Sequence, residues 1–191
     1  MITFQRRKTD CLSKTDKSSI GSWDKPIKFL CDEINKKKEF YTLSSCSGRV
    51  VLIKNLEKKQ PDMFVFRSHK KVKSKKLLNE LNKASKTKET LIFKQEPPIL
   101  HVCCDSLEDA ENILERAHIA GWKNSGIMSI RGRIVLELRS TEYLALPIME
   151  KGEILVKDEF LEILVKESNK RIERGWEKIG KLLKLIESLK L

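Results

Sequence analysis

The segment from Ser44 to Arg49 combines the groups best suited to hold a ligand. Its members are Ser44, Ser45, Cys46, Ser47, Gly48 and Arg49, between two stretches that resemble β-strands. Glycine lets backbone N–H groups come close to a ligand, and hydroxyl groups add hydrogen-bond donors. An arginine could bind a carboxylate or a phosphate through two hydrogen bonds. We expect a ligand-binding loop, although an ordinary polar turn with a buried structural cysteine fits the same residues.

Two histidines elsewhere could accept a proton in a reaction. His69 and His101 are each expected at or beside the end of a strand, and imidazole exchanges protons near neutral pH. Each of the two could instead be only a hydrogen-bonded structural residue. Asp24 stands where a helix is expected to begin and is expected to cap that helix. Cys46 as a nucleophile would need a base beside it, and its sequence neighbours supply none.

Further polar residues stand at the expected ends of other strands, where binding sites commonly collect. Taken singly, each of them also fits a solvated surface position. They are Lys94 and Glu96, then Asn124, Ser125 and Gly126, and finally Arg139, Ser140 and Thr141. Beside them, Trp122 offers either a stacking surface for a nucleic-acid base or an apolar plug for the core.

The composition indicates a polyanionic partner. Lysine and arginine total 39 against 27 aspartate and glutamate residues, which gives a net charge of +12. A charge of that size attracts nucleic acid, with an affinity that falls as the salt concentration rises. A lysine-rich surface adapted to high temperature is the alternative explanation.

The 5 cysteines and 3 histidines fit neither a disulfide framework nor a zinc motif. The cysteine count is odd, the spacing is irregular, and no Cys-x-x-Cys pair occurs. We therefore expect reduced thiols, a cytoplasmic protein and no metal. The N-terminal residues lack an apolar signal core, and no run of about 18 apolar residues occurs, so we expect no secretory signal and no membrane span.

Hydrophobic periodicity predicts an alternation of helices and short strands. Helix starts are expected at Asp24 with Pro26 in the first turn, at Ser74, after a capping box of Asp105 and Glu108, and at Asp158. Strands are expected at 40–42, 50–54, 63–68, 91–93, 99–103, 126–130, 133–139, 143–148 and 153–156.

This order of elements predicts an α/β or α+β fold with a mixed, largely antiparallel β-sheet and flanking helices. We expect a single domain over residues 1–191. Residues 158–191 should form a long amphipathic helix that packs on that domain or on a partner chain. Residues 4–19 could form a short helix or an arm. No Gly-x-Gly-x-x-Gly sequence follows a strand, which argues against a Rossmann nucleotide site.

Taken in order, these motifs resemble the wybutosine-synthesising protein 3 family, named TYW3 in eukaryotes and Taw3 in archaea. The block from Ser44 to Arg49 is the most specific part, and the resemblance runs from about Phe4 to the C-terminal helix. The chain departs from the family pattern at Phe64 and Phe66, where a tryptophan is common, and at Gly175, where a second asparagine is expected. The other segments that carry the resemblance are Ser68-His69, Phe93, Glu96-Pro97, Leu100-His101-Val102, Cys104, Asn124-Ser125-Gly126-Ile127, Arg139-Ser140-Thr141, Leu146-Pro147 and Asn169.

The resemblance implies a non-Rossmann enzyme that transfers a methyl group from S-adenosylmethionine to N4 of a 7-aminocarboxypropyl-demethylwyosine base. That base occupies position 37 of tRNA(Phe), in the anticodon region. Residues Ser44–Arg49 are then expected to bind the donor, and Asp24, His69 or His101 to take the acceptor proton. Arg49 would meet a carboxylate, either that of the methionine part of the donor or that of the aminocarboxypropyl chain of the acceptor. The residues expected to contact the acceptor are Lys94, Glu96, Asn124, Ser125, Gly126, Arg139, Ser140 and Thr141. Surface lysines, including Lys70, Lys71 and Lys73, would bind phosphates of the anticodon stem.

Two other functions fit the same sequence. A non-catalytic tRNA-binding protein would bind tRNA but would show no saturable binding of a methyl donor. A small-molecule enzyme would bind a donor, would have no affinity for tRNA, and would act on a free base or nucleoside. The sequence does not predict the oligomeric state.

Overall fold

The computed structural model of the chain describes residues 3–14, 23–57, 60 and 62–189. The chain folds into two compact units, each assembled from separate stretches of sequence. Unit 1 comprises Met1–Ser47, Pro98–Thr141 and Gly175–Leu191, and unit 2 comprises Gly48–Pro97 and Glu142–Arg174. Residues 15–19 of the expected helix or arm, and residues 190–191 of the expected C-terminal helix, lie outside the described residues.

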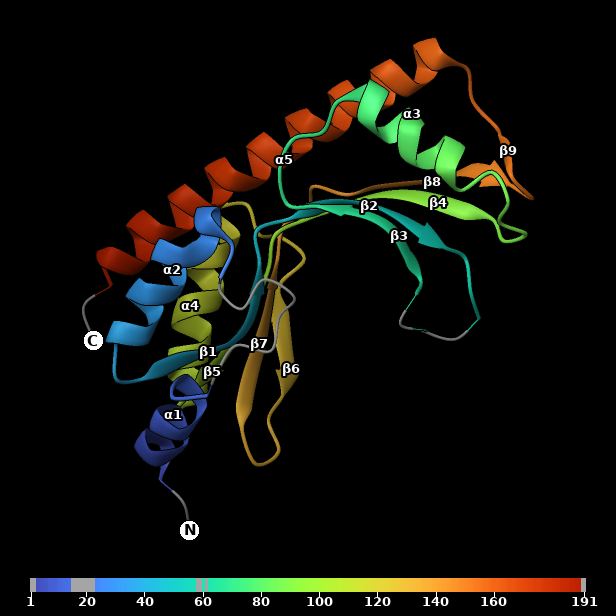
Figure 1. Ribbon diagram of the computed structural model, residues 1–191. Coiled ribbons are helices and arrows are strands. Elements are labelled where there is room, and N and C mark those ends of the chain that lie inside the picture. Colours follow the sequence, from blue (N-terminus) through green and yellow to red (C-terminus); the bar gives the residue numbers. More distant parts are fainter. Residues whose placement is uncertain (1–2, 15–22, 58–59, 61, 190–191) are drawn as a thin grey trace. The chain divides into compact units, whose positions relative to one another are not determined.

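Helices and strands alternate along the described residues (Figure 1). The helices are α1 (Phe4–Leu12), α2 (Lys25–Lys36), α3 (Ser74–Lys83), α4 (Leu107–Ile119) and α5 (Asp158–Glu187). The strands are β1 (Phe40–Cys46), β2 (Arg49–Lys54), β3 (Phe64–Ser68), β4 (Leu91–Glu96), β5 (Ile99–Cys104), β6 (Gly126–Ser129), β7 (Ile134–Arg139), β8 (Leu144–Glu150) and β9 (Glu153–Ile154).

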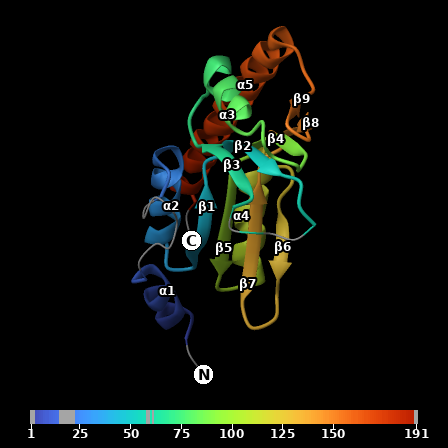
Figure 2. The same ribbon diagram turned by 45° about the vertical axis from the view of Figure 1, so that its right-hand side comes forward.

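Unit 1 is built on a four-stranded antiparallel sheet in the order β1-β5-β7-β6, seen in Figure 2. The register places His101 of β5 between Ser44 of β1 and Glu137 of β7. Adjacent residues of a strand point to opposite faces, so Leu100 and His101 face opposite sides of the sheet. An irregularity in the pairing between Thr42 and Ser44 marks a β-bulge in β1.

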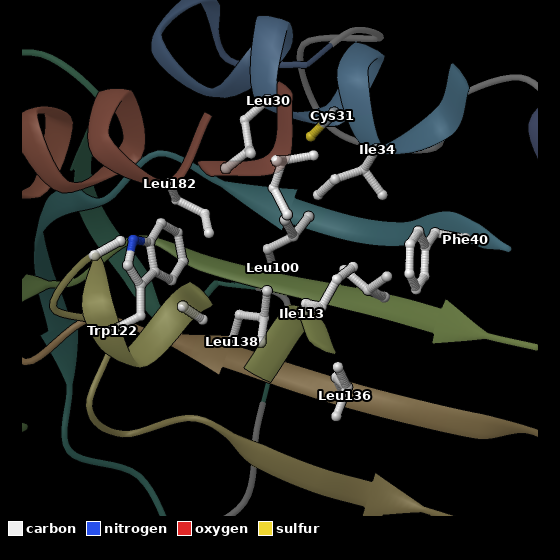
Figure 3. Packing of buried hydrophobic residues seen from close by; sticks show 14 of the residues in the cluster. Leu30, Cys31, Ile34, Phe40, Leu100, Ile113, Trp122, Leu136, Leu138 and Leu182 are labelled. Atoms are coloured by element: carbon white, nitrogen blue, oxygen red, sulfur yellow. The ribbon is translucent and has the colours of Figure 1, made fainter. Parts of the chain in front are cut away.

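Helices α2 and α4 and the C-terminal part of α5 cover one face of this sheet. Strand residues Leu100, Leu136 and Leu138 form a single buried core with Ile113 of α4 and Leu182 of α5 (Figure 3). His101 therefore points to the other face. The core fixes the position of β5, and with it the position of His101.

Trp122 follows α4 and lies fully inside this core. Its indole Nε1 donates a hydrogen bond to the Lys178 carbonyl at 3.2 Å. Gly121 ends α4 with a φ of 91°, a left-handed conformation that favours glycine. The alternative that Trp122 plugs the core is therefore confirmed.

The other face of the unit 1 sheet is partly covered by α1. Phe4 packs against Tyr41 with ring centroids 5.2 Å apart, in a small cluster with Cys103 and Val135. Arg7 donates from Nη1 to the Gly132 carbonyl at 2.9 Å. Residues 4–12 are thus a packed helix and not an extended arm.

Unit 2 contains a five-stranded antiparallel sheet in the order β3-β2-β4-β8-β9. Its strand β2 pairs with both β3 and β4. Pro97 and Pro98 end β4 before β5 begins, which is the interruption that the sequence predicts. The two sheets share no strand in the described residues.

Helix α5 buries the apolar stripe that the sequence predicts. Leu161, Leu164, Val165 and Ile172 are buried in its first part, and Ile179, Leu182 and Ile186 are buried in its second. The Asn169 carboxamide accepts from the Val72 N–H at 2.9 Å and donates to the Val72 carbonyl at 2.8 Å, which joins α5 to the segment before α3 within unit 2.

The predicted fold class is confirmed, because the chain combines helices with antiparallel sheets and ends in a long helix. The division into two separate sheets was not predicted. That the two units act as one domain stays a prediction. Within the described residues, no helix is long and apolar enough to span a membrane.

Two local predictions need correction. Strand β1 continues to Cys46, so only Ser47 and Gly48 separate it from β2. The capping box of α4 uses Ser106 and Asp109 and not Asp105 and Glu108. Ser106 Oγ accepts from the Asp109 N–H at 3.0 Å, and the Asp109 carboxylate accepts from the Ser106 N–H at 3.2 Å.

Candidate functional site

In unit 1, Asp24 and Ser47 form a buried pair. Asp24 occupies the N-cap position of α2, as predicted, but the expected capping hydrogen bond is wrong, because its carboxylate makes none to that helix. Asp24 Oδ2 accepts from the backbone N–H of Ser47 at 2.9 Å and from Ser47 Oγ at 3.1 Å. These two hydrogen bonds hold the turn after β1 against the start of α2 and so fix the position of Ser47.

Ser44 and His101 meet on the face of the sheet that lies away from the core. Ser44 Oγ lies 2.8 Å from Nδ1 of His101. His101 Nε2 lies 3.2 Å from Oε2 of Glu137 on the neighbouring strand. A carboxylate only accepts hydrogen bonds, so Nε2 carries a proton, and in the neutral ring Nδ1 then accepts from the Ser44 hydroxyl. In the neutral imidazole these contacts favour the tautomer protonated at Nε2.

A pocket of about 360 Å³ opens beside Ser44 and His101 in unit 1. Its walls combine apolar and cationic side chains. The residues that line it are Leu43, Ser44, His101, Met128, Ser129, Arg131, Arg133 and Val135. Apolar walls with a few converging polar groups are typical of sites for small organic groups.

Ser45 points toward the core side and contacts a buried thiol. Its hydroxyl hydrogen-bonds with Cys31 of α2, and burial raises the pKa of the Cys31 thiol to about 12. Burial likewise raises the pKa of Cys103 and of Cys104. These three thiols therefore stay protonated near neutral pH and are not nucleophiles. Cys46, at the end of β1, is half-buried.

In unit 2, Arg49 and Glu96 form an ion pair between neighbouring strands. Arg49 donates from Nε to Oε2 of Glu96, and the guanidinium lies 5.2 Å from the centre of the Phe64 ring. Gly48 precedes it with a φ of 91°. The ion pair and the ring hold Arg49 in one orientation, which leaves the terminal guanidinium nitrogens as the groups that could bind an oxyanion.

Two further predicted residues lie in unit 2. Lys94 is half-buried on β4, opposite Val51 of β2 and Ala145 of β8. His69 directly follows β3 and is half-buried. Lys70 and Lys73 are exposed, whereas Lys71 forms an ion pair with Glu173 at 2.6 Å.

Polar groups of the loop after Trp122 form hydrogen bonds within the loop and to the end of β7. Ser125 Oγ donates to the Trp122 carbonyl at 2.6 Å and accepts from the Arg139 N–H at 2.9 Å. The Asn124 N–H donates to the Arg139 carbonyl at 3.2 Å. Gly126 begins β6, where an added side chain would meet open space. These contacts bring Asn124, Ser125 and Arg139 together.

The segment after β7 is also tied down within unit 1. The N–H of Ser140, whose side chain is buried, donates to the Pro98 carbonyl at 3.1 Å. Thr141 Oγ1 accepts from Lys178 Nζ at 2.9 Å. Ser140 is thus held by a backbone hydrogen bond to the residue before β5, and Thr141 by a side-chain hydrogen bond from α5.

Glu137, Arg131 and Arg133 were not predicted as site residues from the sequence. The alternating pattern of β7 predicts that Glu137 faces away from the core, but only the strand register reveals His101 as its partner. The two arginines flank Gly132 at the expected β6–β7 turn. That turn could have been marked as a basic site, because two arginines in three residues are a charge cluster.

The chain matches the family model described as Methyltransferase TYW3 over residues 6–188. It is 32% identical to the tRNA wybutosine-synthesizing protein 3 homolog of Danio rerio, over 97% of this chain and 75% of that protein. It is 36% identical to a protein of Archaeoglobus fulgidus named tRNA(Phe) 7-((3-amino-3-carboxypropyl)-4-demethylwyosine(37)-N(4))-methyltransferase, over 84% of this chain and 81% of that protein.

The fold is similar to a solved structure, that of the PH1069 protein from Pyrococcus horikoshii. The two chains superpose with a TM-score of 0.87 at 31% identity, over 98% of this chain and 96% of the other. The fold, the motifs and the family model thus agree over almost the whole length. The resemblance inferred from the motifs is confirmed: the chain belongs to the TYW3 methyltransferase family.

Proposed function

We propose that this chain methylates N4 of 7-aminocarboxypropyl-demethylwyosine at position 37 of tRNA(Phe), with S-adenosylmethionine as the methyl donor. The observation that carries the proposal is the match to archaeal relatives whose names specify this reaction. They come from Archaeoglobus fulgidus and Thermococcus sibiricus, at 36% and 35% identity. The net charge of +12 supports a polyanionic substrate.

The hydrogen-bonding groups of residues 44–49 suit S-adenosylmethionine as a ligand. S-adenosylmethionine supplies a methyl group on a positively charged sulfur, together with a carboxylate and an amino group. Arg49 would bind the carboxylate through its terminal nitrogens, since its Nε is bonded to Glu96. Ser45 and Cys46 would add hydrogen-bonding groups, and Gly48 would let the backbone come close to the donor. Ser47 is buried and donates both its N–H and its hydroxyl to Asp24, so it would hold the turn in place.

The reaction also needs a group that accepts the proton lost by N4. Asp24, His69 and His101 are the candidates. The contacts of His101 support it most strongly, because its Nδ1 already accepts from a hydroxyl while Glu137 holds its Nε2. Asp24 is occupied by two hydrogen bonds from Ser47. The protein otherwise contributes alignment of the two reactants and exclusion of water.

Contacts to the tRNA are divided between base and backbone. Exposed lysines, including Lys70 and Lys73, would bind phosphates of the anticodon stem. The residues proposed to contact the acceptor are Lys94, Glu96, Asn124, Ser125, Gly126, Arg139, Ser140 and Thr141. All five cysteines lie in the described residues and none of them forms a disulfide, which supports a reducing compartment, and we place the enzyme in the cytoplasm.

The test is methyl incorporation from labelled S-adenosylmethionine into tRNA(Phe) that bears the aminocarboxypropyl intermediate. Unmodified tRNA(Phe) is the control, and mass spectrometry of the digested tRNA locates the methyl group. We expect one methyl at N4 of the intermediate and none on the control. Tight tRNA binding by a folded protein without incorporation would favour the non-catalytic alternative.

A further inference from the structure

The pocket beside His101 has a volume and a lining that suit an anionic aromatic group. Its volume is about 360 Å³, and its apolar walls come from Leu43, Met128 and Val135. Met128 is 58% exposed, and its flexible thioether chain can pack against a ring face. Ser44 and His101 provide a hydrogen-bonding edge at one side.

Two arginines give the same pocket its charge. Arg131 and Arg133 stand on either side of Gly132, whose φ of 74° belongs to the tight β6–β7 turn. Arg7 of α1 bonds the Gly132 carbonyl, and Arg133 hydrogen-bonds with the Tyr41 side chain. These contacts fix the turn at both sides, and both arginines line the pocket. Paired guanidinium groups recognise an anion with two oxygens, such as a carboxylate.

The chain Ser44–His101–Glu137 gives the pocket a way to receive a proton. The two contacts measure 2.8 Å and 3.2 Å and run through opposite nitrogens of the imidazole. Because Nδ1 accepts from the Ser44 hydroxyl, the lone pairs of Ser44 Oγ remain for an N–H group of a ligand. Ser44 is exposed, whereas His101 and Glu137 are half-buried.

We propose that this pocket holds the acceptor base, with Arg131 and Arg133 facing the carboxylate of its side chain and Ser44, His101 and Glu137 taking the N4 proton. The inference rests on the proposed function. It moves Ser44 from the donor contacts to the acceptor contacts, and it leaves Arg49 for the carboxylate of the methyl donor.

The proton and the charges balance in this arrangement. As the N4–CH₃ bond forms and the S–CH₃ bond of the donor breaks, the bonding electrons stay on sulfur, which becomes a neutral thioether. The N4 proton passes to Ser44 Oγ while the Ser44 proton passes to Nδ1 of His101. The positive charge of the donor thus ends on the imidazolium, where the Glu137 carboxylate neutralises it. Ser44 touches the substrate, whereas Glu137 is a positioning residue that acts through His101.

The first experiment measures tRNA binding in the absence of a donor. It compares tRNA(Phe) carrying the aminocarboxypropyl group with the precursor tRNA that carries 4-demethylwyosine and lacks this group. We expect Arg131→Ala and Arg133→Ala each to weaken binding of the first tRNA about 10-fold and to change binding of the second by less than about 2-fold. The matched control is Lys181→Ala, an exposed cation on α5, the helix that covers the opposite face of the sheet.

Equal losses on the two tRNAs would show that the arginines bind backbone phosphates and would overturn the assignment of the carboxylate. The absence of any loss would overturn the pocket itself. Because binding is measured without turnover, neither result depends on the methyl donor.

The second experiment tests the proton path. Ser44→Ala should lower kcat about 100-fold, and Glu137→Gln about 10-fold, with little change in the Kd for the tRNA. Nitrogen-15 NMR of labelled histidines at pH 8, assigned with His101→Gln, should show a neutral ring protonated at Nε2. Glu137→Leu should lose this tautomer preference, and Glu137→Gln should retain it because an amide oxygen still accepts from Nε2.

A ring protonated at Nδ1, or an unchanged kcat in Ser44→Ala, would overturn the proton path. If the wild-type protein itself transfers no methyl group to the modified tRNA, the proposed function fails. If the wild-type protein is active and the variants behave like it, only the pocket assignment fails.

Discussion

The two ends of the Ser44–Arg49 segment have different chemistry, although only a two-residue turn separates the strands that carry them. At the serine end, Ser44 shares a hydrogen bond with His101, whose ring can gain or lose a proton. At the arginine end, Arg49 is paired with Glu96 and held against Phe64. The first end can move a proton, and the second can only hold a charge, because arginine does not deprotonate in proteins.

The difference follows from strand pairing and not from the local sequence. Strand β1 pairs with β5 and places Ser44 opposite His101. Strand β2 pairs with β4 and places Arg49 opposite Glu96. A change confined to one end should therefore alter the contacts of that end and spare those of the other.

The largest effect is expected at the arginine end. Arg49→Ala removes a charged hydrogen-bonding fork and should weaken binding of S-adenosylmethionine about 100-fold, measured by calorimetry without tRNA. Arg49→Lys keeps the charge without the fork and should lose about 10-fold. His101→Gln at the other end is the control and should bind the donor normally. Unchanged donor affinity in Arg49→Ala would remove Arg49 from the donor site.

The next effect is on stability and concerns the serine end. Asp24→Ala leaves the buried N–H and hydroxyl of Ser47 without their acceptor, so the free energy of unfolding should fall by about 2 kcal/mol in urea denaturation. Ser47→Ala removes only the hydroxyl bond and should cost about 1 kcal/mol. A double-mutant cycle gives the coupling between the two side chains, and zero coupling would contradict the pairing.

The elements of this fold were predictable from local signals, because each signal lies within a few residues. Asp24 with Pro26 marks the start of α2, and Gly121 marks the end of α4. The partners of the site were not predictable, since they are set by strand register. Asp24 meets Ser47 across 23 positions of sequence, and His101 meets Glu137 across 36.

The division into two sheets could not be predicted either, because it also depends on strand pairing. Pro97 and Pro98 indicate a break between β4 and β5, but they do not show that the two strands join different sheets. That outcome depends on which partners the strands pair with. The resemblance to a family supplied the candidate residues, and the register then showed which of them touch.

A smaller effect is expected at the turn that joins the two ends. Gly48 has a φ of 91°, and a side chain there would strain the backbone, so Gly48→Ala should lower the free energy of unfolding by about 1–2 kcal/mol. Gly126→Ala is the matched control, because an added side chain at Gly126 meets open space and no positive φ is required there. Equal stability of the two variants would mean that the turn relaxes at no cost.

The smallest effect concerns the thiol beneath Ser45. Burial raises the pKa of Cys31 from 9.0 to about 12. The unfolded chain therefore releases this proton above pH 9, whereas the folded chain keeps it until about pH 12. The free energy of unfolding should then fall by up to about 1.4 kcal/mol per pH unit in that interval, so that about 1.4 kcal/mol is lost by pH 10 relative to neutral pH. Below about pH 8 the contribution of Cys31 is constant.

Urea denaturation of wild type and Cys31→Ala between pH 8 and pH 11 measures this slope. The variant should be less stable at pH 8 because of the cavity, and its slope should be smaller by one proton. Ser45→Ala removes the hydrogen bond that lowers the pKa of Cys31, so the slope should persist to higher pH. If the free energy of unfolding has the same pH dependence in wild type and in Cys31→Ala, the thiol ionises at the same pH in the folded and unfolded chains. Water would then reach Cys31 beneath Ser45 despite its burial.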